Sequence, residues 1–386
     1  MGAARSDTAG MRGARLHPGS ACPAASVSLM ASEAEDELNP RSRELILDLP
    51  VLARRYGLGE VRGWSHLPHG LMNPNWRVAA DAGDFALKGL VDVSAEKAER
   101  NFALPRVLAS AGIPVCAARP ADDGSLVLRV NEGRAYALFD WAFGEHIPGC
   151  ELDIEQAAFL GDLLGRLHLA MEQAARNADW PAAAGPAHSK VVEVPVALAE
   201  AERFLGVIAA LPSSDTFDVE VAQDLQRRRD MLSEHASRRP DDDLPLGPWG
   251  RTHGDFQYRN LLWSDGRVAA ILDWDRVGVR ALAEEVARTV AVQFVHDDGV
   301  MDLPRVAAFT AAYRSVVPLK DEDLVDAVRR LWWRWATDLW PLAWHYERGD
   351  HSCDSLWSGQ ARLLTWWCDH FDEVDAAVAG VDVSWG

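Results

Sequence analysis

Three polar residues in the C-terminal half of the chain have the spacing that phosphoryl transfer requires. In the segment Thr252-His-Gly-Asp-Phe-Gln-Tyr-Arg-Asn260, Asn260 follows Asp255 by five positions. Asp273 comes thirteen residues later, after the apolar run Val268-Ala-Ala-Ile-Leu272. Phosphoryl transfer needs a carboxylate that receives the acceptor hydroxyl, together with an Asn and an Asp that hold Mg²⁺ against the nucleotide phosphates.

A predicted hairpin separates Asn260 from Asp273. The turn sequence Ser264-Asp-Gly-Arg267 joins two short strand-like runs, so that the second runs back along the first. We therefore expect Asp273 to lie beside Asn260. The sequence contains no Walker A motif, which excludes a P-loop kinase.

The two motifs, His253-Gly-Asp255 with Asn260 and Ile271-Leu-Asp-Trp274, closely resemble those of the aminoglycoside phosphotransferase superfamily. That superfamily includes choline kinase and a branch of the homoserine kinases, all similar to protein kinases in fold. The resemblance implies that Asp255 is the catalytic base, that Asn260 and Asp273 bind Mg²⁺, and that His253 braces the catalytic loop. It also implies ATP or GTP as the phosphate donor.

Lysine usage singles out Lys88 independently of the motifs. Only four of the 39 basic residues are lysines, so arginine supplies positive charge almost everywhere in this chain. Lys88 ends the otherwise apolar run Phe85-Ala-Leu-Lys88. The planar fork of Arg does not replace a compact ammonium at a phosphate site. We predict that Lys88 contacts the nucleotide phosphates, as the resemblance also implies.

The resemblance implies two further nucleotide contacts. The loop His69–Asn75 would cover the phosphates, and its residues Gly70, Asn73 and Asn75 are the candidates for this contact. The segment Tyr136–Gly144 would form the hinge between the lobes. Adenine would then be bound by the backbone near the residues Asp140, Trp141 and Ala142.

A kinase lysine pairs with a Glu on the following helix. Family spacing points to Asn101, which is not an acid, whereas Glu99 and Glu96 lie nearby. We predict Glu99 as the partner of Lys88, with a solvated helix face as the alternative.

Several neighbouring residues remain open between two roles. Gln257 and Arg259 either contact phosphate or hold the catalytic loop, and Asp275 is expected to support the metal-binding residues. The segment Glu284–Arg288 resembles a stabilising helix start that follows the metal motif. His168, on an apolar helical stripe, is predicted to be a hydrogen-bonded core residue.

The C-terminal part is rich in tryptophan and acidic residues. Helix packing explains most of this set, while some members are expected to line an acceptor cleft that suits a cationic alcohol. The nearby residues His345, His351, Cys353 and Asp354 fit no zinc spacing, so the sequence predicts no metal site there. The tryptophans are Trp332, Trp333, Trp335, Trp340, Trp344, Trp357, Trp366 and Trp367. The interleaved acids are Asp338, Glu347, Asp350, Asp354 and Asp369.

The order of predicted elements indicates an α+β fold with two lobes, like that of protein kinases. Strand-like runs dominate the first part of the chain, and helices dominate the rest. We expect a disordered tail at residues 1–40, a nucleotide-binding lobe with a small antiparallel sheet at 41–141, and a helical lobe at 142–386. The last of these would carry the catalytic loop and the acceptor site.

The expected elements are short and well separated by turn residues. Helices are predicted at 44–57, 94–111, 219–236 and from 154 onward, and loops fill most of 177–250. Strands are predicted at 61–64, 75–79, 84–90, 125–130 and 135–141.

Composition limits the function classes. A formal net charge of −19 argues against nucleic-acid binding, since phosphate backbones are held by basic surfaces. Five cysteines without a C-x-x-C pair favour a reducing compartment, and no apolar run reaches the roughly 18 residues of a membrane span. We predict a cytoplasmic protein and make no prediction of its oligomeric state.

We predict a kinase that transfers the γ-phosphate of ATP or GTP to a hydroxyl of a small molecule. A cationic antibiotic or an amino-alcohol is the expected acceptor, and homoserine or a sugar is the alternative. A non-catalytic nucleotide-binding regulator is a second class, but such proteins usually lose the base or a metal ligand, and all three positions are intact. A protein kinase is disfavoured because the Arg-Asp pair and the Ala-Pro-Glu segment are absent.

Overall fold

A computed structural model describes residues 40–68, 72–177 and 188–380 of the 386-residue chain. The predicted tail lies outside these residues, except for Pro40, where the first helix begins. Residues 69–71 of the predicted phosphate loop, which include Gly70, also lie outside the described residues.

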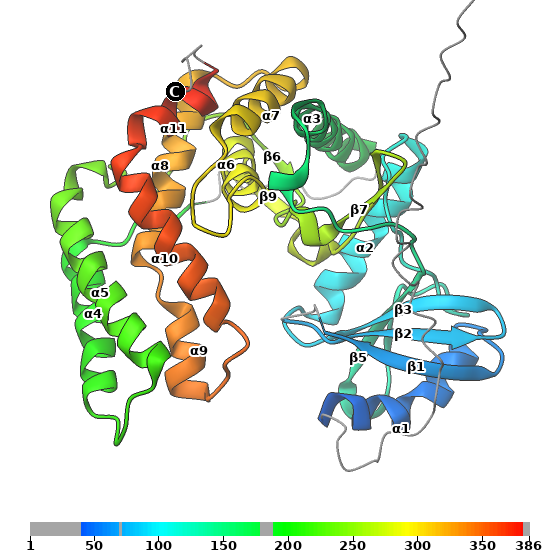
Figure 1. Cartoon of the computed structure of the whole chain (residues 1–386). Helices are drawn as coiled ribbons and strands as arrows, with labels where there is room; N and C mark the ends of the chain where they lie inside the picture. Colours follow the sequence, from blue (N-terminus) through cyan, green and yellow to red (C-terminus); the bar gives the residue numbers. More distant parts are fainter. Residues whose placement is uncertain (1–39, 69–71, 178–187, 381–386) are drawn as a thin grey trace, which may run out of the picture.

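The N-terminal part is a five-stranded antiparallel sheet that is covered on one face by helix α1 (Pro40–Arg55) (Figure 1). The strand order is β1-β2-β3-β5-β4, so β3 is central. Apolar residues of α1 pack against alternate residues of the strands, among them Phe85 and Leu87 of β3. Lys88 follows in the sequence and therefore points to the opposite face. The strands are β1 (Val61–Leu67), β2 (Asn75–Ala80), β3 (Gly83–Leu90), β4 (Val127–Arg129) and β5 (Ala135–Asp140).

Helix α2 (Ala95–Ser110) lies between the sheet and the helical part of the molecule (Figure 1). It begins at the predicted position because the Ser94 side chain accepts a hydrogen bond from the Lys97 backbone N–H. The helix continues through Pro105. These helices and strands confirm the predicted elements of this part, while the predicted domain boundary after residue 141 stays a prediction.

The remainder of the chain is mainly helical, which confirms the α+β fold class. Helix α4 lies where loops were predicted, so that prediction was wrong: Pro195 stands in the first turn of the helix, where its missing N–H costs no hydrogen bond. None of the helices in the described ranges is both long enough and apolar enough to cross a membrane. The helices are α3 (Ile154–Asn177), α4 (Val194–Ala209), α5 (Thr216–Glu234), α6 (Leu282–Gln293), α7 (Leu303–Val316), α8 (Asp321–Thr337), α9 (Trp340–Arg348), α10 (Asp354–Asp369) and α11 (Phe371–Ala379).

Two small antiparallel ribbons carry the predicted catalytic and metal-binding segments. Strand β6 (Trp249–Thr252) pairs with β9 (Gly278–Ala281), and the segment that follows β6 contains Asp255. Strand β7 (Leu261–Ser264) pairs with β8 (Arg267–Ile271), as the turn sequence predicted.

The tryptophan-rich helices α8 and α10 pack against each other and against the neighbouring helices α5, α6, α9 and α11. Four of the eight tryptophans are fully buried, which confirms helix packing as their role. Trp340 keeps 37% of its surface exposed, and its ring meets that of Trp344 edge to face at 5.5 Å. The buried four are Trp332, Trp333, Trp357 and Trp367.

Candidate active site

The catalytic loop holds the Asp255 carboxylate in a nearly closed ring of donors. Asn260 Nδ2 donates to Asp255 Oδ2 at 2.9 Å, and Gln257 Nε2 lies 3.1 Å from both carboxylate oxygens. The Arg288 guanidinium of α6 lies 2.6 Å from Asp255 Oδ1. Only 13% of the Asp255 side chain is exposed, so these donors fix its orientation.

His253 connects the catalytic loop to the segment that carries Asp273. The residue is fully buried, and its Nε2 lies 2.9 Å from the carbonyl oxygen of Leu272, directly before Asp273. The adjacent Gly254 has a φ of 87°, and a Cβ there would lie 2.4 Å from the Arg276 carbonyl oxygen. Only glycine fits this position, which explains the His-Gly-Asp order.

Glu285 of α6 anchors the backbone of the catalytic loop. Its carboxylate accepts hydrogen bonds from the backbone N–H groups of His253, at 2.9 Å, and Gly254. It also lies 2.7 Å from His168 Nε2, whose other ring nitrogen meets the Tyr313 hydroxyl at 2.8 Å. His168 is therefore a buried core residue with both nitrogens bonded, as predicted, and Glu285 joins α3 and α6 to the loop.

The charge state of Glu285 follows from these contacts. Complete burial acts to raise its pKa, but the hydrogen bonds and charges of His168 and His253 more than offset this, so the pKa lies below its ordinary value. A carboxylate with a lowered pKa stabilises the fold fully above its ordinary pKa of about 4.3, and this stabilisation is lost as the pH falls through the folded-state value.

Replacing Glu285 by Gln is expected to lower the free energy of unfolding at neutral pH by about 3–5 kcal/mol, because buried donors lose their charged acceptor. Denaturant titration would measure the loss. The wild type should lose stability on acidification more steeply than E285Q. Glu284, the half-buried neighbour, provides the control, and E284Q should change stability by no more than about 0.5 kcal/mol. Equal effects of the two substitutions would contradict the anchoring role.

The two predicted metal ligands, Asn260 and Asp273, lie next to each other and present oxygen atoms. Asn260 uses Nδ2 to hold Asp255, and its Oδ1 accepts no hydrogen bond from the described residues. The Leu272 N–H donates to the Asn260 carbonyl oxygen at 2.8 Å, which places Asp273 beside it. The Asp273 side chain is 39% exposed. An amide oxygen and an accessible carboxylate are donors that fit Mg²⁺.

Asp273 adopts an uncommon backbone conformation. Its φ of 59° lies in the left-handed region, which few non-glycine residues occupy. Strain of this kind persists at functional sites because the surrounding structure holds it. Partial burial acts to raise the Asp273 pKa, but the Lys88 ammonium outweighs it, and the pKa is lowered. The carboxylate is therefore charged at neutral pH.

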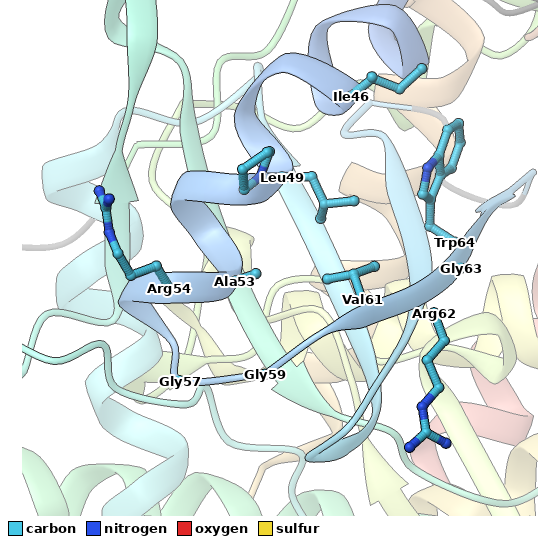
Figure 2. Close-up of a pocket in the computed structure, with 11 residues that line it drawn as sticks. Ile46, Leu49, Ala53, Arg54, Gly57, Gly59, Val61, Arg62, Gly63 and Trp64 are labelled. Carbon is cyan, nitrogen blue, oxygen red and sulfur yellow. The ribbon is translucent and has the colours of Figure 1, made fainter.

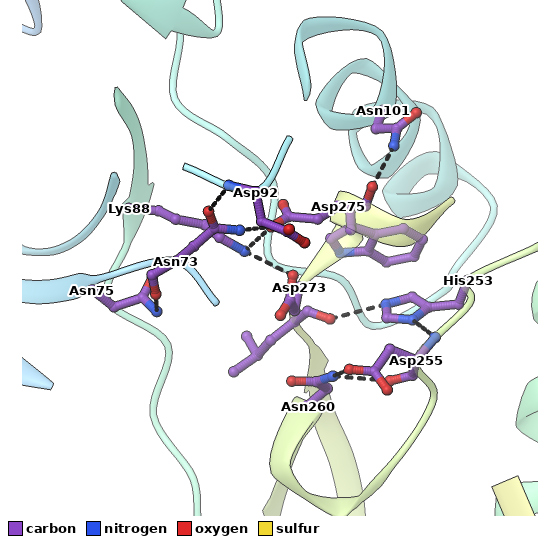
Figure 3. A network of polar contacts seen from close by, with 12 residues as sticks. Asn73, Asn75, Lys88, Asp92, Asn101, His253, Asp255, Asn260, Asp273 and Asp275 are labelled. Carbon is purple, nitrogen blue, oxygen red and sulfur yellow. Dashed lines mark hydrogen bonds and ion pairs between the residues drawn. The ribbon is translucent and has the colours of Figure 1, made fainter. Parts of the chain in front are cut away.

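Lys88 bridges two carboxylates at the centre of the network in Figure 3. Its Nζ lies 2.7 Å from Asp273 Oδ1 and 2.5 Å from Asp275 Oδ2, and only 8% of the side chain is exposed. Burial acts to lower the Lys88 pKa, but the two carboxylates raise it above its ordinary value. Lys88 from the sheet and Asp273 from the helical part thus meet in one site.

The predicted ion pair between Lys88 and Glu99 is wrong. The Glu99 carboxylate instead accepts the backbone N–H groups of Leu126, at 3.0 Å, and Val127, at 2.7 Å. It therefore fixes the entry to β4. Asn101, at the family's acidic position, donates through Nδ2 to the Asp275 carbonyl oxygen at 2.9 Å.

Asp275 supplies the second carboxylate that Lys88 needs, a role that sequence reasoning missed. Burial and the Asp273 charge raise the Asp275 pKa, although the Lys88 ammonium opposes them. Asn73 Nδ2 donates to Asp275 Oδ2 at 2.6 Å. The sequence shows that Asp275 follows Asp273 by two positions, but this spacing does not indicate which of the two carboxylates faces Lys88.

The described part of the predicted phosphate loop is tied to this network. Asn73 Oδ1 accepts the backbone N–H groups of Val91 and Asp92 at 2.8 and 3.0 Å, and Asn75 Nδ2 donates to the Asn73 carbonyl oxygen at 3.0 Å (Figure 3). Both ends of the Asn73 amide are thus engaged within the protein. Direct nucleotide contacts of Asn73, Asn75 and Gly70 stay predictions.

The predicted hinge begins where β5 ends. The Trp141 N–H donates to the Asp84 carbonyl oxygen at 3.1 Å, and Asp140 pairs with Arg119 at 2.9 Å. Two backbone hydrogen bonds, of 2.9 and 2.8 Å, then join Glu145 to Trp263 of β7. The segment of Asp140, Trp141 and Ala142 therefore leads directly to the ribbon that carries Asn260, and adenine binding there stays a prediction.

A groove of about 740 Å³ lies elsewhere, between α1 and the edge strand β1 (Figure 2). Its walls include Leu49, Val61 and Trp64. None of the predicted catalytic, nucleotide or metal residues lines it, so it is separate from the candidate site.

Helix α8 packs against α6, the helix that supplies Arg288 to the catalytic loop. Burial lowers the Arg334 pKa, and the charges that act on this guanidinium include Glu284 and Arg288 of α6 and Asp338 at the end of α8. Asp338 Oδ1 accepts the Trp340 N–H at 3.2 Å. Arg334 of α8 is therefore under the influence of charged groups of α6, one of which, Arg288, contacts Asp255.

Residues 63–319 match the phosphotransferase enzyme family. A homoserine kinase from Burkholderia ambifaria is 28% identical over 296 residues, which cover 74% of this chain and 80% of that protein.

Solved structures of small-molecule kinases share the fold. The amicoumacin kinase hAmiN, in complex with AMP-PNP, Ca²⁺ and Ami, superposes with a TM-score of 0.52 at 16% identity, covering 84% of this chain and 96% of its own. A microcompartment-associated aminopropanol kinase superposes with a TM-score of 0.52 at 18% identity. The superposition covers 87% of this chain and 99% of the aminopropanol kinase chain. At these identities the likeness concerns the fold alone, and it confirms the predicted kinase-like architecture.

Proposed function

The chain belongs to the phosphotransferase enzyme family, and we propose that it transfers the γ-phosphate of ATP to a hydroxyl of a small molecule that also carries an amino group. The family confirms the predicted enzyme class, a small-molecule kinase. The observation that carries the proposal is the convergence of Lys88 from the sheet with Asp255, Asn260 and Asp273 from the helical part.

Asp255 is proposed as the catalytic base. As the acceptor oxygen attacks the γ-phosphorus and the bond to the ADP oxygen breaks, the hydroxyl proton passes to the Asp255 carboxylate. Arg288 and Gln257 hold that carboxylate in one orientation, so little reorganisation is needed during the reaction. His253 and Glu285 act as positioning residues because they hold the loop.

Lys88 is proposed to bind the nucleotide phosphates, and its ammonium faces the same space as Asp273. Asn260 and Asp273 would hold Mg²⁺, which neutralises phosphate charge when bound. Asp275 would retain Lys88 when Asp273 turns to the metal, because Asn73 fixes the Asp275 carboxylate independently.

The wall near the C-terminal end of α8 supports an amino-bearing acceptor. Trp340 offers a partly exposed aromatic ring and Asp338 offers a carboxylate, at the end of the helix that contacts α6, whereas the Arg348 guanidinium already lies over the Trp344 ring at 5.0 Å. Aromatic faces and carboxylates attract alkylammonium groups. The names of the relatives agree with this class, because aminopropanol and homoserine each carry a hydroxyl and an amino group. Homoserine is the second candidate, since the homoserine kinase match spans most of both chains.

A panel of acceptors tests the proposal. We expect ADP release to be fastest with amino-alcohols, homoserine or amino-bearing antibiotics, and slow with sugars that lack an amino group. The measurement is kcat/KM for each acceptor with ATP and with GTP. A preference for an acceptor that lacks an amino group would overturn the amino-group requirement, and nucleotide binding without transfer to any acceptor would favour a non-catalytic regulator.

Trp340→Ala links this preference to the wall. Loss of one cation–π contact, about 0.5–2 kcal/mol, should raise the KM of a cationic acceptor by about 2–30-fold without changing the KM of ATP. Trp64→Ala, in the groove at the edge of the sheet, is the control and should change neither constant.

A further inference from the structure

Three metal-binding side chains meet where α9 gives way to α10. Helix α9 ends at Arg348 and is capped by Gly349, whose φ of 65° turns the chain back, and α10 begins at Asp354. This turn brings His345, His351 and Asp354 together, with one nitrogen or oxygen atom from each within 4.8 Å of the others. The set shares no residue with the candidate active site.

The contacting atoms form a small triangle. His345 Nδ1 lies 3.0 Å from both Asp354 carboxylate oxygens and 3.1 Å from His351 Nδ1. His351 Nδ1 lies 3.4 Å from Asp354 Oδ2. Cys353 lies apart from the triangle, beside the Ser352 hydroxyl at 3.7 Å.

With Asp354 ionised, hydrogen bonds alone cannot satisfy all three edges of this triangle. A proton on His345 Nδ1 points at Asp354, so it cannot also bond His351. If both imidazoles carry a proton on Nδ1, each can donate to Asp354, but the two N–H groups then face each other at 3.1 Å. A cation between the three atoms turns every edge into a ligand–ligand distance and removes this conflict.

The edges match the size of a zinc coordination shell. Zn²⁺ binds imidazole nitrogen at about 2.0–2.1 Å and carboxylate oxygen at about 2.0–2.2 Å, so tetrahedral ligands are about 3.3 Å apart. The observed edges are 3.0, 3.1 and 3.4 Å. Two imidazoles also favour a first-row transition metal over Mg²⁺, which prefers oxygen ligands.

The surroundings position the inner ligands and leave the outer one accessible. The His345 side chain is 10% exposed and stacks on Phe217 of α5 at 4.6 Å, while Asp354 is 25% exposed. His351 is 67% exposed, so the triangle opens to solvent on one side. Three protein ligands and an open position are typical of zinc sites that also bind water or another molecule.

We propose that His345, His351 and Asp354 form a transition-metal site that binds Zn²⁺, with water in the remaining position. The site does not depend on the proposed kinase activity. Its spacing of six and three residues across a helix–turn–helix junction differs from the zinc-finger pattern, which is why the sequence did not predict it.

Zinc titration of the chelator-treated full chain, in excess Mg²⁺, tests the proposal. Calorimetry should show one Zn²⁺ bound per chain through this site. Loss of an outer-shell partner of a metal ligand typically costs about 10–100-fold in metal affinity. His351→Ala removes a direct ligand, so we expect it to weaken zinc binding by more than this. His351 is exposed, so the variant should fold normally, and an unchanged melting temperature without metal would verify this.

A matched His–carboxylate pair provides the control. His296 Nε2 lies 3.5 Å from Asp302 Oδ2, with the His side chain 44% exposed, and the structure places no third ligand from the described residues with them. His296→Ala should leave zinc affinity unchanged. Co²⁺ gives a second readout, since tetrahedral Co²⁺ bound to the wild type should absorb visible light and H351A should not. Equal zinc affinity of wild type and H351A would overturn the site.

Discussion

Replacing Asp255 by Asn is expected to lower kcat by about 10²–10⁴-fold, the usual contribution of a general base. The KM of ATP should change little, because Asp255 is proposed to act on the acceptor hydroxyl and Lys88 on the phosphates. Asn has the same size and keeps the contact with Asn260, so the catalytic loop should stay folded. Steady-state rates of ADP release with the best acceptor, together with calorimetry of ATP binding, would measure both effects.

Asp265→Asn is the control for this substitution. Asp265 lies exposed in the turn between β7 and β8 with a φ of 52°, a conformation that Asn also adopts readily. D265N should therefore keep wild-type kcat. If D255N also kept kcat within a few-fold while binding ATP normally, Asp255 would not be the base, and the acceptor would have to lose its proton directly to solvent or to the phosphate.

Sequence reasoning succeeded where chain neighbours determine the geometry. Asp255 and Asn260 are five residues apart in one loop, and a hairpin with an unambiguous turn returns Asp273 to them. Lys88 was identified because it is one of few lysines in an arginine-rich chain. Side chains alternate between the two faces of β3, so Lys88 points away from the buried face that holds Leu87. Each of these placements depends on local structure.

The contacts that the sequence did not reveal join distant segments. Asn73 and Asp275 are 202 positions apart, and their contact depends on how the sheet sits against the helical part. Glu99 was assigned to Lys88 by proximity along a helix, but the rotation of α2 directs it to the backbone of β4 instead. The Arg288–Asp255 pair likewise requires the packing of α6 under the loop. Tertiary packing determines these partners, and the spacing of residues along the sequence does not predict it.

The same argument explains the His345, His351 and Asp354 triangle. Their separation is short in the sequence, but the angle between α9 and α10 decides whether their side chains converge. Known zinc spacings describe other turns and do not apply here.

Replacing Lys88 by Arg is expected to lower kcat/KM for ATP by about 10²-fold, although it keeps the charge; loss of one preorganised donor at a reacting centre has this size. The Lys88 ammonium is a single nitrogen that fits between Asp273 and Asp275 at 2.7 and 2.5 Å, in a position that is almost fully buried. A guanidinium is larger and planar, so it must displace one carboxylate or move out of the site.

Lys320→Arg is the control, because the chain offers a lysine where only charge is needed. Lys320 is 76% exposed and pairs with Glu322 at 2.9 Å, so K320R should keep the wild-type kcat/KM for ATP. ATP titrations of ADP release compare the two variants, and melting temperatures show whether each is folded. Wild-type activity of K88R would mean that positive charge alone is sufficient at this position. The scarcity of lysine in the chain would then reflect composition only.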